Sequence, residues 1–359
     1  MHALLALLLA LPAAPEPQDT PTAPELLQAP DVEAGDFDWI RLTSGEWLKG
    51  EILRLRDGTL EFDSDELGEL NLDWDDIAYL RTGKTQTLLL TDQSTLEGTL
   101  VLSGGRVYIG GAQALELPGG ELCAILPGAG GDTGVWSGNA SLGFVMRRGN
   151  TSTTDLSTNL FARRETVRTR WDSSYKGAFS RTQGVETANN HRLQSQYDYF
   201  LSPRLYVTPI TAVAYRDPFS NIDLRLTPAA GFGYDLLDEN TLSWEVGGGP
   251  AFQYTRFESV AAGQDQTDAS LAVFANTRIA WDVTPDVEMS FGYEITAPVP
   301  DTDEYNHHLS SAISVDLVGS LDLDVNFVWD RINKPPVDQD GNTPRSDDIR
   351  LSVGLGWDF

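Results

Sequence analysis

The chain ends in Ile349–Phe359, which reads IRLSVGLGWDF, and apolar residues alternate there with polar or small ones. Successive side chains of a β-strand point to opposite faces, so the segment predicts a strand with two different faces. The apolar face carries Ile349, Leu351, Val353, Leu355, Trp357 and Phe359. The other face carries Arg350, Ser352, Gly354, Gly356 and Asp358. Such a strand lies between an apolar and a polar environment.

The same alternation extends back to residue 136, for example over 321–330, 287–296 and 222–236. Each stripe has five or six alternating positions, which matches the roughly 9–11 tilted residues with which a β-strand crosses a bilayer. The segments number about twelve. We therefore predict an all-β fold in which residues 136–359 form a closed antiparallel transmembrane β-barrel of about 12 strands.

The connections between these segments alternate between short turns and longer loops, as in outer-membrane barrels. Aromatic residues gather at the expected strand ends, which is typical of the two membrane interfaces. The row at the short turns contains Trp136, Trp171, Tyr199, Trp244, Trp281 and Trp357. The row at the long loops contains Phe144, Phe179, Tyr215, Tyr254, Tyr293 and Trp329.

Closure of the barrel is a physical requirement, because lipid offers no hydrogen bonds and every backbone N–H and C=O must pair internally. The first segment, Trp136–Met146, must therefore pair with Ile349–Phe359. Pro209, Pro228 and Pro250 fall inside predicted strands, where each removes a ladder hydrogen bond. They mark either bulges or a shift in register.

The N-terminal part divides into three regions. Residues 1–14 form a short apolar run that ends in small residues, which predicts a secretory signal peptide. Residues 15–35 are rich in Pro and Ala and predict a linker. Residues 36–127 alternate over short runs separated by turn residues, which predicts a small periplasmic β module with an SH3-like fold.

This small module contains a faint internal repeat at a spacing of about 48 residues. Thr43, Leu48, Gly50, Ile52 and Ile77 correspond to Thr91, Leu96, Gly98, Leu100 and Ile125. Two interpretations follow, either two small SH3-like barrels or one duplicated β unit.

Three stretches resemble a family described as salt-induced outer-membrane proteins, known mainly as a domain of unknown function. They are Trp136–Gly143 (WSGNASLG), Arg148–Thr154 (RGNTSTT) and Val353–Phe359 (VGLGWDF). The resemblance covers about 136–359 and implies an outer-membrane barrel, often preceded by a small β domain. It also implies recognition of the terminal strand, ending at Phe359, by the barrel-assembly machinery. It supplies no catalytic residues.

Composition excludes several classes of function. The chain has 53 acidic and 25 basic residues and a net charge of −28, which argues against a nucleic-acid partner. One cysteine and four histidines leave little basis for a disulfide framework or a zinc site, so we expect no metal and no cofactor. No apolar run of about 18 residues follows the N-terminus, which argues against a transmembrane helix.

The polar faces of the strands supply the candidate site. The residues expected to line the lumen are Asp172, Lys176, Asp198, Asp235, Glu245, Asp282, Glu288, Glu294, Asp316, Asp322, Asp324 and Asp358. Carboxylates that surround a narrow wet pore favour cations. The expected function is therefore a structural envelope role or a narrow pore for small cationic or neutral solutes. The alternative for the lumen is that paired side chains fill it and nothing passes.

Two other functions are alternatives to the pore. A periplasmic or secreted all-β ligand-binding protein would fold without detergent, with its apolar faces turned inward. A lipid hydrolase would need a Ser and a His near the lipid-facing rim. His308 and Ser310 share the inward face, which is wrong for a lipid substrate, so we predict no enzyme activity. The expected partners are outer-membrane lipid and lipopolysaccharide.

Overall fold

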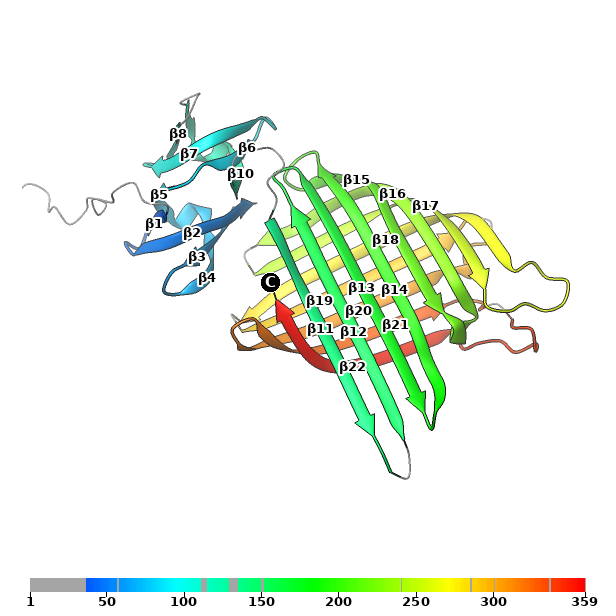
Figure 1. Ribbon diagram of the computed structural model, residues 1–359. Coiled ribbons are helices and arrows are strands. Elements are labelled where there is room, and N and C mark those ends of the chain that lie inside the picture. Colours follow the sequence, from blue (N-terminus) through cyan, green and yellow to red (C-terminus); the bar gives the residue numbers. More distant parts are fainter. Residues whose placement is uncertain are drawn as a thin grey trace, which may run out of the picture. The chain divides into compact units, whose positions relative to one another are not determined.

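The computed structural model describes residues 37–56, 58–110, 115–128, 135–149, 152–239, 241–284, 286–299, 301–335 and 337–358. The predicted signal peptide, residues 1–14, and the predicted linker, residues 15–35, lie outside the described residues. The regular elements of the described residues are β-strands and short 3₁₀ turns, and they form two sheets (Figure 1). No helix in these ranges is long and apolar enough to cross a membrane.

The first sheet comprises ten strands and two 3₁₀ turns. The strands are β1 (Asp38–Leu42), β2 (Trp47–Arg56), β3 (Thr59–Ser64), β4 (Gly68–Asp73), β5 (Ile77–Arg81), β6 (Gln86–Leu90), β7 (Thr95–Ser103), β8 (Arg106–Gly110), β9 (Leu115–Pro118) and β10 (Leu122–Pro127). The turns are η2 (Trp74–Asp76) and η3 (Gly119–Glu121). Strands β1, β5, β7, β6, β10 and β2 pair in this order, and a β1–β2 pairing closes them into a small barrel.

The small barrel is one duplicated unit rather than two barrels. Strands β1–β5 with η2 form the first half, and β6–β10 with η3 form the second half. The pairings β1–β2, β2–β3, β3–β4 and β1–β5 recur as β6–β7, β7–β8, β8–β9 and β6–β10. The halves interlock because β5 pairs with β7 and β10 pairs with β2. Both halves contribute to one core, in which Phe62 and Leu100 are fully buried.

The repeated glycines Gly50 and Gly98 allow a close approach between neighbouring strands. A Cβ atom on Gly98 would lie 2.0 Å from the carbonyl oxygen of Gly110, and one on Gly50 would lie 1.9 Å from that of Asp63. We expect Gly98→Ala to destabilise the small barrel by about 1–3 kcal/mol, because the backbone must shift to accept the methyl group. Hydrogen-exchange mass spectrometry should show faster exchange over β7 and β8. Gly120→Ala is the control, because a methyl group there would have no atom within 4 Å. Equal exchange in the two variants would contradict the packing argument.

Asp38 of β1 is a buried acid in the small barrel. Its carboxylate accepts hydrogen bonds from the backbone N–H groups of Ile52 and Gly83, each at 2.8 Å. Burial raises the pKa of the Asp38 carboxyl above its ordinary value of 3.8, although the two N–H groups act in the opposite direction. The folded state therefore holds this proton more tightly than the unfolded state does.

This raised pKa predicts a pH dependence of stability. The contribution of Asp38 is fully present below its unfolded pKa and is lost as the pH rises through the folded-state pKa. We expect the urea midpoint of the small barrel to rise, relative to that of Asp38→Asn, as the pH falls from about 7 to about 4. Pulsed hydrogen exchange at one labelling pH measures both midpoints. Parallel pH profiles for the two proteins would refute the prediction.

The second sheet is a closed ring of twelve antiparallel strands in chain order. They are β11 (Val135–Arg147), β12 (Thr153–Glu165), β13 (Thr169–Thr182), β14 (Val185–Phe200), β15 (Leu205–Asp217), β16 (Ile222–Glu239), β17 (Leu242–Phe257), β18 (Thr267–Thr284), β19 (Val287–Pro298), β20 (Asn306–Val318), β21 (Leu321–Ile332) and β22 (Asp347–Asp358). Two 3₁₀ turns, η4 (Pro218–Ser220) and η5 (Thr302–Glu304), lie in the longer loops. The predicted all-β class and the closed barrel of 12 strands are confirmed.

Closure joins the first strand to the last, as predicted. Strand β22 pairs with β11 from Asn139 opposite Asp358 to Leu142 opposite Leu355. Figure 1 shows β22, in red, beside β11, in green. The ring leaves no free edge, so each of the twelve strands pairs with a neighbour on both sides.

The outer surface of this barrel is apolar. Leu142, Phe144, Leu271 and Leu351 each expose more than half of their surface, although they lie within strands. The aromatic row at the short turns is also exposed, and Trp136 packs edge-on against Trp171 with ring centroids 6.1 Å apart. The apolar stripes therefore point away from the barrel interior.

One member of the predicted aromatic rows, Tyr215, is misplaced. Its side chain is only 6% exposed, and its hydroxyl donates to Asp217 at 3.1 Å inside the barrel. The cause is a register shift in β15 between Thr208 and Thr211, which contains Pro209 and Ile210. The inward positions change there from even to odd numbers, since Tyr206 and Thr208 are buried before the shift and Val213 is buried after it. Pro209 thus marks a bulge, one of the two outcomes expected for a proline in a strand.

Candidate functional site

The interior of the large barrel contains charged side chains at two levels. We call the level near the short turns the turn-end network, which comprises Arg163, Arg170, Asp172, Gln196, Asp198, Tyr206, Thr208, Glu245 and Arg278. We call the level near the long loops the loop-end cluster, which comprises Lys176, Arg192, Arg225, Glu294, His308, Asp330 and Arg350. These residues come from strands all around the ring, so the barrel fold assembles both levels.

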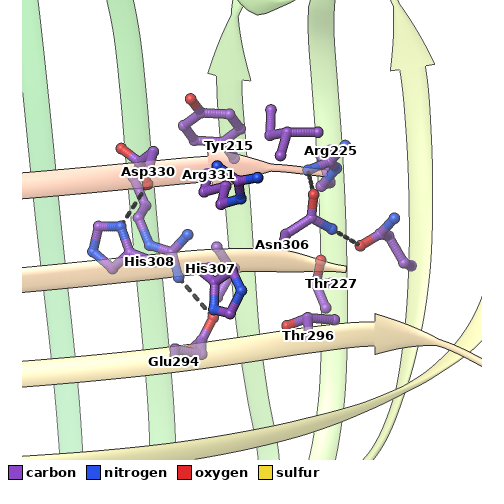
Figure 2. A pocket seen from close by; sticks show the side chains of 14 residues that line it. Tyr215, Arg225, Thr227, Glu294, Thr296, Asn306, His307, His308, Asp330 and Arg331 are labelled. Carbon is purple, nitrogen blue, oxygen red and sulfur yellow. Dashed lines mark hydrogen bonds and ion pairs between the residues drawn. The ribbon is translucent and has the colours of Figure 1, made fainter. Parts of the chain in front are cut away.

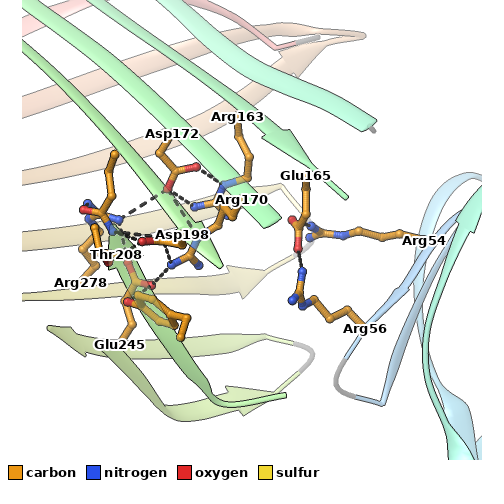
Figure 3. Close-up of polar contacts among 12 residues, drawn as sticks. Arg54, Arg56, Arg163, Glu165, Arg170, Asp172, Asp198, Thr208, Glu245 and Arg278 are labelled. Atoms are coloured by element: carbon orange, nitrogen blue, oxygen red, sulfur yellow. Dashed lines mark hydrogen bonds and ion pairs between the residues drawn. The ribbon is translucent and has the colours of Figure 1, made fainter. Parts of the chain in front are cut away.

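Arg170 is the centre of the turn-end network (Figure 3). Its Nη2 lies 3.0 Å from Asp198 Oδ2 and 2.8 Å from Glu245 Oε2. Strand β13 carries Arg170 and β17 carries Glu245, and three strands separate them in the ring, so this contact spans the lumen. Asp198 is fully buried and also accepts a hydrogen bond from the Thr208 hydroxyl at 2.6 Å.

Two more arginines neutralise the carboxylates of this network. Arg163 binds Asp172 through Nε at 2.8 Å and Nη2 at 2.9 Å, a bidentate arrangement. Arg278 Nη1 lies 2.8 Å from Glu245 Oε1. The network thus pairs three arginines with three carboxylates, and it ties strands β12, β13, β14, β17 and β18 together.

Glu165, the last residue of β12, has its own partners. Its carboxylate forms ion pairs with Arg54, at 2.5 Å, and with Arg56, both of strand β2 (Figure 3).

The loop-end cluster also contains a contact across the lumen. Arg192 Nη2 of β14 lies 2.7 Å from Glu294 Oε1 of β19, and four strands separate these two in the ring. Asp330 lies 2.7 Å from His308 Nδ1 and 2.7 Å from Arg350 Nη2 (Figure 2 shows the His308 contact). Arg225 donates to Asn306 Oδ1 at 2.9 Å and to Thr255 Oγ1 at 3.2 Å.

A cavity of about 40 Å³ lies in the loop-end half of the barrel. Its lining includes Arg192, Arg225, Asn306, His308 and Asp330 (Figure 2). At about 10–15 Å³ for each water, this space holds about three waters.

The structure distributes the predicted lumen residues over several environments. Asp172, Asp198 and Glu245 belong to the turn-end network, and Lys176 and Glu294 belong to the loop-end cluster. Asp235, Asp322 and Asp324 are buried, and Asp324 accepts a hydrogen bond from Ser314 at 2.7 Å. Asp282, Glu288 and Asp316 are exposed near the short turns. The side chain of Asp358 lies outside the described residues.

The residues that the prediction from sequence missed are mainly the arginines. Arg163, Arg170, Arg192, Arg278 and Arg350 occupy the same alternating positions as the predicted carboxylates. Alternation along the strands predicts that these arginines point inward. Arg170 has the same even numbering as Asp172 in β13, and Arg192 has the same even numbering as Asp198 in β14. Counting only the carboxylates overstates the negative charge of the lumen.

The hydrolase alternative finds no support in the contacts of His308. Its Nδ1 bonds Asp330, and none of the hydrogen bonds in the described part of the chain joins His308 to a serine. Within these same ranges, no group of three or more His, Cys, Asp or Glu side chains is arranged to hold a metal ion.

A family model described as "Protein of unknown function, DUF481" matches residues 140–359. This chain belongs to the DUF481 family. The DUF481 match begins within β11 and runs to the end of the chain, so it covers the twelve-stranded barrel. It confirms the family resemblance drawn from the three sequence stretches.

Several solved structures match this DUF481 chain at low sequence identity and low structural similarity. The NanC porin is 10% identical, with a TM-score of 0.38, over 62% of this chain and 99% of that one. The outer membrane channel DcaP of Acinetobacter baumannii is 10% identical, with a TM-score of 0.27, over 90% and 94%. The monoaromatic hydrocarbon channel CymD is 8% identical, with a TM-score of 0.30, over 77% and 87%. No curated protein matches the chain.

Proposed function

We propose that this protein spans the outer membrane through its twelve-stranded barrel and forms a narrow pore for small solutes. One observation supports this most strongly: the closed ring of strands exposes apolar side chains outside and holds charged side chains inside. A barrel in lipid needs this arrangement, because its outer face meets hydrocarbon and its backbone must pair fully.

The periplasmic ligand-binding alternative predicts the reverse arrangement. A water-soluble barrel turns its apolar stripes inward and its polar residues outward. Here Asp198 and Asp172 are buried inside, whereas Phe144 and Leu351 are exposed outside. Soluble monomers rarely expose apolar patches larger than a few hundred Å². The arrangement of side chains therefore favours the membrane protein.

The pore we propose is narrow. The ion pairs Arg170–Glu245 and Arg192–Glu294 both span the lumen, and the loop-end cavity is only about 40 Å³. Water and small ions fit such a passage, whereas larger nutrients require side chains to rearrange. The expected preference for cations assumed free carboxylates, but Asp172, Asp198, Glu245 and Glu294 are ion-paired. We therefore propose that the pore carries small solutes. We also propose that its charge preference is set by those lysine and arginine side chains of the lumen that form no ion pair with a described residue.

Location and partners complete the proposal. An even number of strands brings both ends of the barrel to the same side, and in an outer membrane this is the periplasm. We propose that the small barrel lies there, and that lipid and lipopolysaccharide surround the large barrel. We also propose that the assembly machinery recognises the terminal strand that ends at Phe359. Membrane fractionation tests the location, and recovery in the soluble periplasmic fraction would contradict it.

Conductance in a planar lipid bilayer tests the pore directly. We expect the purified full-length protein to produce discrete, ohmic steps, and the heat-denatured protein to produce none. A second function, structural support of the envelope, is favoured by the cross-lumen ion pairs, because they would also serve to brace a closed barrel. Protein that inserts correctly but conducts no current would overturn the pore and support the structural role.

A further inference from the structure

The loop-end cluster has more positive charges than its carboxylates neutralise. Glu294 neutralises Arg192, and Asp330, together with Asp348 at 3.7 Å, neutralises Arg350. Lys176 and Arg225 have no carboxylate within ion-pair distance among the residues that the structure describes. Arg225 bonds only the neutral groups of Asn306 and Thr255. These two buried cations therefore form no ion pair with a described carboxylate.

The charge of Asp330 acts on Lys176, but this carboxylate already contacts His308 and Arg350. Lys176 is directly opposite Arg192 in the pairing of β13 and β14, and both side chains point into the barrel. Like charges opposite each other in a sheet destabilise it. Lys176 also makes no hydrogen bond to any described residue, although its ammonium group has three donors. Stability of the fold alone therefore does not explain a lysine at position 176.

Two hydrogen-bond donors on the arginines of this cluster have no acceptor in the described part of the chain. The Nε–H groups of Arg192 and Arg350 are buried and have no acceptor among the described residues. Most buried polar groups in proteins are hydrogen-bonded, and an exception usually indicates a water or an ion. Surplus positive charge and surplus donors in one region indicate an acceptor that carries negative charge.

The loop-end cavity has the size and lining for such a ligand. Arg192 and Arg225 line it together with the neutral groups of Thr227, Gln253 and Asn306 (Figure 2). The cavity has room for about three waters, and a small oxyanion occupies a similar space. Glu294 and Asp330 also line the cavity, but each already contacts a cation or His308. Charge-assisted hydrogen bonds from guanidinium groups suit oxyanions.

We propose that the loop-end cavity binds a small oxyanion, either inorganic phosphate or a short carboxylate. Arg192 and Arg225 contact the anion, and Lys176, which lies outside the cavity lining, contributes positive charge from the neighbouring strand β13. If the pore also carries this oxyanion, the inference names the class of solute and rests on the proposed function. Binding of the oxyanion is a separate claim and can be measured without recording any current.

Isothermal titration of the full-length protein in detergent, at constant ionic strength, measures the binding. Inorganic phosphate and acetate are the two probes, and they distinguish a phosphate site from a carboxylate site. We expect the wild type to bind at least one of them, and Lys176→Met and Arg225→Gln to bind it at least tenfold more weakly. Lys334→Met is the matched control, because Lys334 is an exposed loop cation paired with Asp301 and Asp303. Its affinity should stay within twofold of the wild type.

Folding of each variant is checked by its heat-modifiable migration on a denaturing gel. Lys176→Met removes one of two positive charges that lie opposite each other in the sheet, so we expect it to fold. Failure of the wild type to bind either oxyanion overturns the inference, as does unchanged affinity in both cluster variants. If the wild type binds an oxyanion but carries no current, the site is supported and the pore is wrong. If it carries current but binds neither oxyanion, the pore is supported and the site is wrong.

Discussion

Val353→Arg should destabilise the folded barrel by about 2–4 kcal/mol in lipid vesicles, because it places a guanidinium group near the middle of the membrane. Val353 lies near the centre of β22 and is 56% exposed on the outer face. An outward arginine there must lose its hydration or distort the bilayer. Urea unfolding in vesicles, followed by the shift in gel migration, measures the difference in the free energy of unfolding.

Val318→Arg is the control for this prediction. Val318 is the last residue of β20 and is 80% exposed, so the same substitution falls at the predicted interface. The cost there should be only about 0–1 kcal/mol. In a water-soluble barrel, both arginines would be exposed to water and each would change stability by about 0.5 kcal/mol or less. Two small and equal effects would therefore contradict a membrane location.

Arg170→Ala should destabilise the barrel by about 3–5 kcal/mol, because it removes the ion-pair partner of the buried Asp198 and one of the two partners of Glu245. Asp198 is fully buried, and Glu245 would retain only Arg278 as an ion-pair partner within 4 Å among the described residues. The variant should also conduct more current than the wild type, because a side chain that spans the lumen is lost. Urea unfolding in vesicles measures the first effect, and single-channel recording measures the second.

Arg181→Ala, on the same strand, is the control for Arg170. Arg181 is exposed, and its guanidinium lies 5.6 Å from the ring centroid of Phe179. Exposed contacts of this kind contribute about 0.5–1 kcal/mol. If Arg170→Ala cost no more than Arg181→Ala, the turn-end network would not stabilise the barrel.

The fold of the large barrel could be predicted because one physical rule controls every strand. Lipid outside and water inside require strict alternation, and closure requires the first segment to pair with the last. Both requirements appear in the sequence of Ile349–Phe359, and the structure confirms the pairing of β11 with β22. The duplication of the small barrel could also be detected, because Gly50 and Gly98 are each required by a close strand approach.

Two features could not be predicted. The bulge at Pro209 changes which residues of β15 point inward, so Tyr215 lies inside the barrel and not on its outer face. The sequence shows the proline, but it does not show whether the strand forms a bulge there. The ion pairs that span the lumen join strands four or five positions apart in the ring. Such pairings depend on the shape of the closed barrel, which alternation along single strands does not reveal.

Spin labels on consecutive residues of β22 test the central claim most directly. Cysteines placed at 351, 352, 353 and 354, in a chain whose Cys123 is replaced by serine, each carry one label in lipid vesicles. We predict that labels at 351 and 353 collide with oxygen dissolved in lipid, and that labels at 352 and 354 do not. Equal exposure of 351 and 353 to a water-soluble nickel reagent would show that the apolar face of β22 meets water instead of lipid.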